Sequence, residues 1–206
     1  MGNTVGSREV LPIVLQSKKK QILELTKSEF DLLLGSVLGD GYITKLGRIQ
    51  IEQGESQREY LEWKYSMLSR ITSSKILVAE RRRSIGKKTF SFRFWTKQYF
   101  HSWRNYFYPY GEKIIPSEVG TILSPLALAV WFMDDGFLRK DNAVAIATEK
   151  FPLENLEEMC QVLLNCYGIE TNIVKRGRIY FGKVATQRFA EIISPFVIPT
   201  MRYKLP

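Results

Sequence analysis

The chain carries the motif FDLLLGSVLGDGY at residues 30–42 and an altered copy of it, PLALAVWFMDDGF, at residues 125–137. In each copy a long apolar run ends in an aspartate, a glycine and an aromatic residue. The two aspartates, Asp40 and Asp135, lie 95 positions apart in a chain of 206 residues. Internal repetition of this kind predicts a protein built from two similar halves.

A second pair of matching segments closes each half. Lys-Ile-Ile-Pro spans residues 113–116, and Lys-Leu-Pro spans residues 204–206. Their lysines, Lys113 and Lys204, lie 91 positions apart, so these segments and the two motifs are nearly in register. We therefore expect a basic N-terminal arm at residues 1–27, mobile around residues 17–20, a first half at 28–116, a linker at 117–123 and a second half at 124–206.

The residues between these landmarks predict the same order of elements in both halves. Apolar residues at helical spacing indicate helices, and strict alternation, as at Phe90, Phe92 and Phe94, indicates strands. In the first half we expect strands at 42–43, 48–53, 75–79 and 89–95 and helices at 57–71 and 97–106. In the second half we expect strands at 142–148, 171–175 and 178–181 and helices at 153–165 and 186–193. Together with its motif helix, each half is predicted to be αββαββα, which makes the fold class α+β.

The two motif segments are expected to be helices that are buried on every side, because they are apolar almost all round. Ser28, with Asp31 three residues later, predicts a capping box for the first helix, and Ser124-Pro125 predicts the start of the second. Gly35 and Gly39 leave one flank of the first helix without side chains. The two helices are therefore expected to pack against each other at close range.

Asp40 and Asp135 are expected at the C-terminal ends of these helices, where the helix dipole disfavours negative charge. Parallel packing would bring the two carboxylates together, and a divalent cation would relieve their repulsion. Asp-Gly also serves as a common helix stop and turn. Its occurrence twice in register, with a lysine segment after each copy, favours a metal site.

Composition indicates a polyanionic partner, with a soluble basic protein without such a partner as the alternative. The 30 Lys and Arg against 21 Asp and Glu give a net charge of +9, which is typical of proteins that neutralise phosphates. Cys160 and Cys166 are too few for a disulfide framework, and a single histidine, His101, argues against His-rich metal chemistry. No apolar stretch approaches the roughly 20 residues of a membrane span. We expect a soluble, intracellular protein without a membrane partner.

The two motifs resemble the paired signature of the LAGLIDADG homing endonucleases, of the single-chain type with two motifs. The similarity lies in residues 35–41 and 131–136, and it extends over about residues 28–206. Gly39 and Asp134 occupy corresponding positions, so Asp134 is an alternative metal ligand to Asp135, but alignment of the Asp-Gly pairs favours Asp135.

The resemblance implies a monomer that cleaves both strands of double-stranded DNA with Mg²⁺, which Mn²⁺ would be able to replace. Asp40 and Asp135 would bind the metal, and Lys113 and Lys204 would be active-site lysines, with phosphate contact as the alternative role. An organelle and a prokaryotic cytoplasm stay open as locations.

Under the same resemblance, each half would carry a curved antiparallel sheet, and the two sheets would form a saddle for DNA. Strand residues opposite the aliphatic faces would contact bases or phosphates, and the basic run near residues 81–88 would clamp phosphates. The predicted DNA-binding residues are Arg48, Gln50, Glu52, Arg81, Arg82, Arg83, Lys87, Lys88, Arg93, Lys175, Arg176, Arg178 and Tyr180.

Two alternatives stay open. One is an RNA-binding intron-splicing cofactor (maturase) on the same fold, with intron RNA as its partner. The other is a DNA-binding protein that does not cleave. Retention of both Asp40 and Asp135 favours the nuclease.

Overall fold

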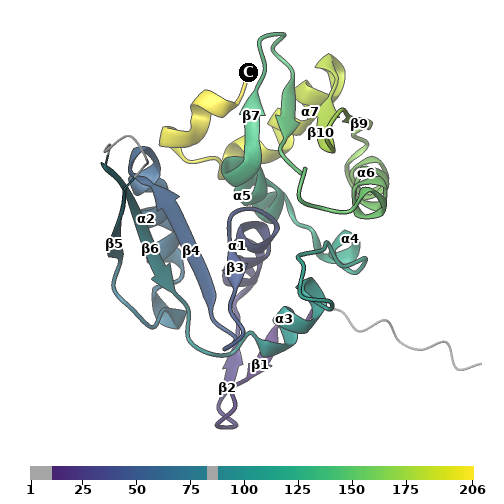
Figure 1. Ribbon diagram of the computed structural model, residues 1–206. Helices are drawn as coiled ribbons and strands as arrows, with labels where there is room; N and C mark the ends of the chain where they lie inside the picture. Colours follow the sequence, from purple (N-terminus) through teal and green to yellow (C-terminus); the bar gives the residue numbers. More distant parts are fainter. Residues whose placement is uncertain (1–10, 83–87) are drawn as a thin grey trace, which may run out of the picture.

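The computed structural model describes residues 11–82 and 88–206, and every structural statement below concerns these residues. A central pair of helices, α1 and α5, separates two four-stranded antiparallel sheets, as Figure 1 shows. In this part of the chain, no helix has both the length and the apolar character needed to cross a membrane.

The first half has the predicted αββαββα order. Its elements are α1 (Lys27–Leu38), β3 (Tyr42–Ile43), β4 (Ile49–Gly54), α2 (Arg58–Met67), β5 (Leu77–Arg82), β6 (Lys88–Trp95) and α3 (His101–Phe107). Short 3-10 helices at Glu55–Gln57 and Ser69–Ile71 flank α2. The strand order in the sheet is β3-β4-β6-β5.

The second half repeats this arrangement. Its elements are α5 (Pro125–Asp135), β7 (Gly136–Leu138), β8 (Val144–Ile146), α6 (Leu153–Tyr167), β9 (Thr171–Val174), β10 (Arg178–Phe181) and α7 (Lys183–Ile193). Two 3-10 helices follow, at Ser194–Phe196 and Pro199–Lys204. The strand order, β7-β8-β10-β9, is the order of the first sheet with each strand replaced by its counterpart. The predicted α+β fold with two pseudo-symmetric halves is therefore confirmed.

Close packing of α1 on α5 depends on the two glycines of the first motif. A Cβ atom added to Gly35 would lie 2.3 Å from the carbonyl oxygen of Ala127 on α5. One added to Gly39 would lie 2.5 Å from the Cβ of Asp134. The capping prediction for α1 is wrong by two residues, because Thr26 is the N-cap and its box partner is Glu29. The predicted cap of α5 by Ser124 is confirmed.

Each sheet turns an aliphatic face toward the helices. The six strand residues predicted to face the core are all buried: Ile49, Ile51, Val144, Ile146, Ile179 and Phe181. The alternation in β6 also buries Phe92 and Phe94, whereas Phe90 near the free end of the strand is exposed. The polar side chains between these positions consequently lie on the opposite face of each sheet.

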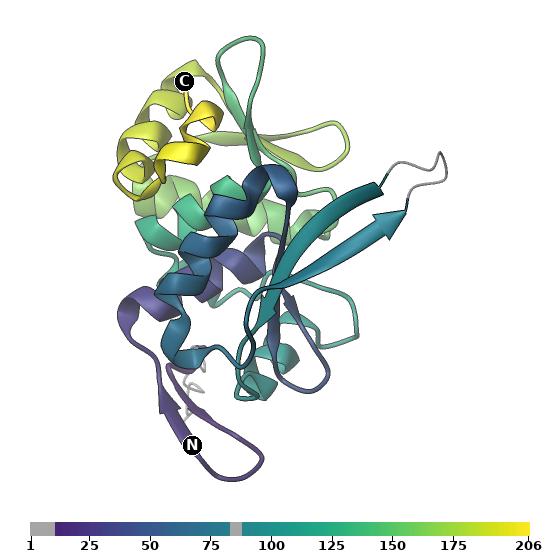
Figure 2. The same cartoon turned by 90° about the vertical axis from the view of Figure 1, so that its left-hand side faces the viewer.

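Two segments outside the repeated units are more ordered than predicted. Residues 1–10 of the predicted arm lie outside the described residues. The region around residues 17–20, predicted to be mobile, is the turn of a hairpin formed by strands β1 (Val14–Gln16) and β2 (Ile22–Glu24), which projects from the lower end of the molecule in Figure 2. Buried Leu15 and Leu23 attach it to the core, and Trp103 donates a hydrogen bond to the Pro12 carbonyl. The segment predicted as a plain linker contains the short helix α4 (Val119–Ile122).

Candidate active site

The ends of the two motif helices open into one cavity of about 350 Å³. Asp40 follows α1 and is exposed, while Asp135 is the last residue of α5 and is partly buried. Both carboxylates line this cavity together with Lys113. The structure thus brings together three of the four residues predicted to be catalytic.

Asp135 has an unusual electrostatic environment. Burial raises the pKa of its carboxyl group to about 7, and the negative charges of Asp40 and Asp134 add to the rise, while Lys113 opposes it. In the described part of the chain, no donor forms a hydrogen bond with this carboxylate. A partly buried carboxylate next to a second one is a favourable position for a divalent cation, which would stabilise the charged forms of both.

Asp40 and Asp135 offer hard carboxylate oxygens, which suit magnesium better than a soft metal. Within residues 11–82 and 88–206, no group of three or more acidic, histidine or cysteine side chains is gathered around one point. Mg²⁺ is commonly held by one or two carboxylates and completes its shell with water and substrate phosphates. Asp40 and Asp135 therefore fit this ion as protein ligands.

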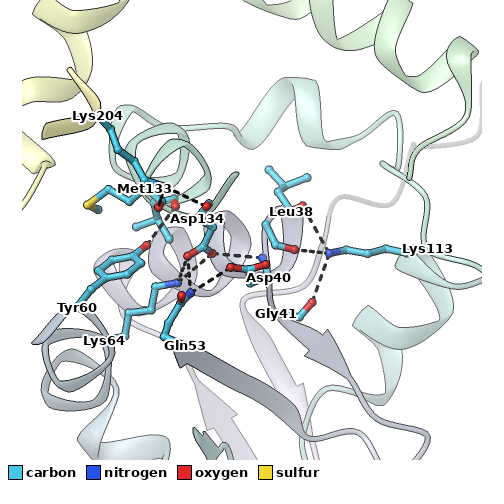
Figure 3. A network of polar contacts seen from close by, with 12 residues as sticks. Leu38, Asp40, Gly41, Gln53, Tyr60, Lys64, Lys113, Met133, Asp134 and Lys204 are labelled. Carbon is cyan, nitrogen blue, oxygen red and sulfur yellow. Dashed lines mark hydrogen bonds and ion pairs between the residues drawn. The ribbon is translucent and has the colours of Figure 1, made fainter. Parts of the chain in front are cut away.

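The two predicted lysines occupy equivalent places at the helix ends. Lys113 Nζ donates to the carbonyl oxygens of Leu38, Gly39 and Gly41, at 3.4, 2.6 and 3.3 Å. Lys204 Nζ donates to the carbonyl oxygens of Met133 and Asp134, at 2.5 and 3.1 Å. Figure 3 shows both lysines in this position. Each cation therefore compensates the negative end of one motif helix.

The lysines differ in their access to the cavity. Burial lowers the pKa of Lys113 to about 8, although the three nearby aspartates favour its charged form. Lys204 is buried as well, which also lowers its pKa, and it does not line the cavity that contains Asp40 and Asp135.

Asp134 has a different environment from Asp135. Its side chain is fully buried and forms an ion pair with Lys64, whose Nζ lies 2.7 Å from Asp134 Oδ1. Burial raises the pKa of Asp134, and the Lys64 ammonium opposes this rise. Of the two candidate ligands that the sequence left open, Asp135 is the one that lines the cavity.

A polar groove of about 830 Å³ adjoins the cavity on the first sheet, and Asp40 lines both. Predicted DNA-binding residues Gln50 and Glu52 line it, and a hydrogen bond of 3.0 Å joins them. Arg93 lies beside this pair, 3.8 Å from Glu52, with its guanidinium group over the Trp95 ring. These side chains are therefore continuous with the candidate active site.

The other predicted DNA-binding residues are more scattered. In the second half, Arg178 pairs with Glu149, Arg139 lies over the Tyr180 ring, and Lys175 and Arg176 are exposed in the turn after β9. Arg48 directly precedes β4, and Lys88 pairs with Glu80 at 3.0 Å. Arg81 and Arg82 belong to β5, while Arg83 and Lys87 lie outside the described residues.

Sequence reasoning missed three residues at this site: Gln53, Lys64 and Lys150. Lys150 lines both the cavity and the groove. Lys64 is fully buried between Tyr60 and Leu68, which are spaced four residues to either side of it. A lysine in the middle of a buried helical stripe was the available signal, because such a cation requires a buried partner.

Comparisons with known proteins identify the family and the fold of this chain. The model of the LAGLIDADG DNA endonuclease family matches residues 30–191. The cytochrome b mRNA maturase bI2 of Debaryomyces hansenii is 27% identical over 196 residues, covering 88% of this chain and 74% of the relative. The DNA endonuclease I-ChuI of Chlamydomonas applanata is 29% identical over 210 residues, covering 89% and 96%. The solved structure of the homing endonuclease I-WcaI bound to its DNA recognition sequence matches with a TM-score of 0.80 and 26% identity, covering 92% and 90%.

Proposed function

Since this chain belongs to the LAGLIDADG DNA endonuclease family, as its two motifs predicted, we propose that it is a sequence-specific homing endonuclease that makes a double-strand break in a long DNA target. The observation that carries the proposal is the pairing of Asp40 and Asp135, which come from the two halves and line one cavity beside a polar groove. The DNA-bound homing endonuclease with the same fold supports double-stranded DNA as the substrate.

Hydrolysis of a phosphodiester requires an activated water, stabilisation of negative charge on the phosphate and a stabilised leaving oxygen. When bound, Mg²⁺ supplies all three, and Mn²⁺ is expected to replace it. Asp40 and Asp135 would hold the metal, each serving one DNA strand. Their origin in equivalent halves supports this division, because the two strands of a duplex are themselves related by a twofold axis.

The lysines have a supporting role in this proposal. Lys113 lines the cavity, and with a pKa of about 8 it is still mainly charged at neutral pH, so it would balance charge near the phosphates or orient a water. Lys204 would act on the other side by holding the C-terminal carbonyls of α5, which carry Asp135 in position. Lys113 does the same for the chain around Asp40.

The sheets supply the proposed DNA contacts. Gln50, Glu52 and Arg93 in the first half and Arg178 and Tyr180 in the second are candidates for base contacts. Exposed lysines and arginines, within a net charge of +9, would contact phosphates. Because one chain contains both halves, we propose that the protein acts as a monomer.

A direct experiment tests the activity. The protein is incubated with Mg²⁺ and a randomised duplex library, and the new DNA ends are sequenced. A single enriched site with cuts on both strands is expected, and it should disappear with EDTA and with the double variant Asp40→Asn/Asp135→Asn. Random ends, or none above that variant, would contradict the proposal.

Splicing assistance is a second candidate function, since a relative of 27% identity carries the name cytochrome b mRNA maturase bI2. Both functions are compatible with one fold. If the gene of this chain lies within an intron, splicing of that intron, measured with and without the protein, distinguishes the two functions. Splicing that is faster in the presence of Asp40→Asn/Asp135→Asn than without protein would show a maturase activity independent of cleavage.

A further inference from the structure

We infer that the buried Lys64–Asp134 ion pair and Gln53 make the two cleavage centres unequal: they hold the Asp40 carboxylate in position, so that the strand served by Asp40 is cut first. This inference rests on the proposed function. It concerns residues that are neither cavity cations nor metal ligands in that proposal, and it assigns them a positioning role.

A continuous series of polar contacts leads from the core to Asp40, as Figure 3 shows. Lys64 Nζ lies 2.7 and 2.9 Å from the two carboxylate oxygens of Asp134, and both side chains are fully buried. Gln53 Nε2 donates to Asp134 Oδ1 at 3.0 Å and to Asp40 Oδ2 at 3.2 Å. The backbone N–H of Asp40 also points at Asp134 Oδ2, at 3.4 Å.

This series of contacts connects the two halves of the protein. Asp134 belongs to α5 of the second half, whereas Lys64 on α2, Gln53 on β4 and Asp40 belong to the first. Asp134, which is next to the proposed metal ligand Asp135, therefore helps to orient the other proposed ligand, Asp40. Gln53 is the side chain that touches both Asp134 and Asp40.

The second half has no counterpart of this arrangement among the residues that the structure describes. At the spacing of 95 that separates the two motif aspartates, the equivalents of Asp134, Lys64 and Gln53 are Gly39, Met159 and Thr148. Gly39 has no side chain and Met159 is buried and apolar. The Thr148 hydroxyl donates to the Gly177 carbonyl at 2.6 Å, within its own half.

The energetics favour a positioning role over simple packing. A buried ion pair contributes little net stability, because desolvation of both charges offsets their attraction. The equivalent position on α6 holds a methionine, so an apolar core residue is compatible with this place in the fold. A carboxylate already held in its binding orientation loses less conformational freedom when it binds the metal and phosphate.

Strand-resolved kinetics test the inference. A duplex target with a different dye on each strand is cleaved under single-turnover conditions. Asp40→Asn and Asp135→Asn first identify which strand each aspartate serves. In the wild type, the Asp40 strand is expected to be cut faster. Equal rates, or a faster Asp135 strand, would overturn the inference.

Two variants then replace these residues with their counterparts from the other half. Gln53→Thr removes the bond to Asp40 and keeps the ion pair. Lys64→Met/Asp134→Gly removes both charges together, so that neither is left buried without its partner. Each is expected to slow the Asp40 strand by about 10- to 100-fold, the usual cost of losing a supporting partner of a metal ligand. Gln53→Thr should also leave the Asp135 strand within about twofold. For the double variant the readout is the ratio of the two strand rates, because Asp134 adjoins Asp135 and its charge acts on it. Equal slowing of both strands would indicate a merely structural role. Met159→Leu, at the position equivalent to Lys64, is the control and should change neither strand.

A readout without cleavage separates this inference from the proposed function. In protein labelled with ¹³C at aspartate Cγ, the Asp40 resonance, assigned with Asp40→Asn, is followed during a Mg²⁺ titration. It is expected to respond at lower Mg²⁺ in the wild type than in Gln53→Thr, and identical titrations would contradict the positioning role. If the wild type cleaves no DNA, the proposed function fails and this titration still decides the role of Gln53.

Discussion

Lys113 and Lys204 occupy equivalent positions at the ends of the two motif helices, although they lie 91 positions apart in the chain. The closest carbonyl to Lys113 is that of Gly39 at 2.6 Å, and Lys204 contacts the carbonyl of the corresponding residue, Asp134, at 3.1 Å. Their environments nevertheless differ, since Lys113 lines the cavity with both motif aspartates and Lys204 does not. This difference leads to the first prediction.

Lys113→Met is expected to slow cleavage by about 100-fold or more, because it removes a charged donor from the site of phosphate hydrolysis. Lys204→Met should slow cleavage less and lower the free energy of unfolding by about 1 kcal/mol, through loss of a cation at a helix C-terminus. Single-turnover rates and urea denaturation measure the two effects. Lys183→Met, on the exposed start of α7, serves as the control, and a larger rate loss for Lys204→Met would contradict the assignment.

Asp40→Asn is expected to abolish double-strand cleavage and leave nicked DNA as the product. The neutral amide keeps the shape of the side chain but binds Mg²⁺ poorly, so the strand that Asp40 serves should be cut at least about 100-fold more slowly. DNA affinity should not fall, because the substitution removes a negative charge facing the phosphates. Gel analysis of a supercoiled plasmid carrying the target distinguishes nicked from linear product. Full linearisation by this variant would refute the role of Asp40.

Asp135 should make the metal-free protein less stable at alkaline pH. Its folded-state pKa of about 7 exceeds the ordinary carboxyl value of 3.8, so burial penalises the charged form. The penalty is absent below the unfolded pKa, near 4, and is complete above the folded pKa. Asp135→Asn is therefore expected to raise the melting temperature in EDTA at pH 8, by about 2–4 °C for each kcal/mol relieved.

That difference in melting temperature should vanish toward pH 4, and Mg²⁺ at pH 8 should stabilise the wild type more than the variant. Differential scanning fluorimetry across this pH range measures both effects. A variant that is less stable than the wild type at pH 8 in EDTA would contradict the assigned environment of Asp135.

Gly35→Ala should destabilise the protein even though alanine favours helices. The added Cβ would lie 2.3 Å from the Ala127 carbonyl oxygen, so α1 and α5 would have to separate. The expected cost is about 1–3 kcal/mol of unfolding free energy. Gly182→Ala is the matched control, because a Cβ there meets nothing within 4 Å. Chemical denaturation measures the free energy of unfolding. A Gly35→Ala variant that is more stable than the wild type would argue against the close helix contact.

DNA binding should weaken steeply as salt is raised. With roughly 6–10 phosphate contacts, affinity is expected to fall by about 10³- to 10⁵-fold between 50 and 200 mM salt. Fluorescence anisotropy with the cognate duplex in EDTA measures this without cleavage. A nearly flat response would contradict phosphate contacts by the basic residues.

Local sequence patterns predicted the duplicated fold well. Both runs of apolar residues that end in Asp-Gly form buried helices in this chain, so the two copies located both halves and their common order of elements. The helix caps were harder to predict, because Thr26-Lys27-Ser28-Glu29 and Ser28-Glu29-Phe30-Asp31 both fit a capping box. Only the first pair makes the reciprocal bonds.

Local sequence patterns could not predict contacts between segments that are far apart in the chain. The hairpin at residues 14–24 was mistaken for a mobile arm, because the surface that covers Leu15 belongs to other elements of the fold. Lys64 and Asp134 are 70 positions apart, and neither local sequence indicates which residue is the partner. Burial of a charge depends on which side chains meet it in three dimensions. The two motifs therefore sufficed to predict the carboxylates, but only the packing of α2 and β4 against α5 determined how Asp40 is held.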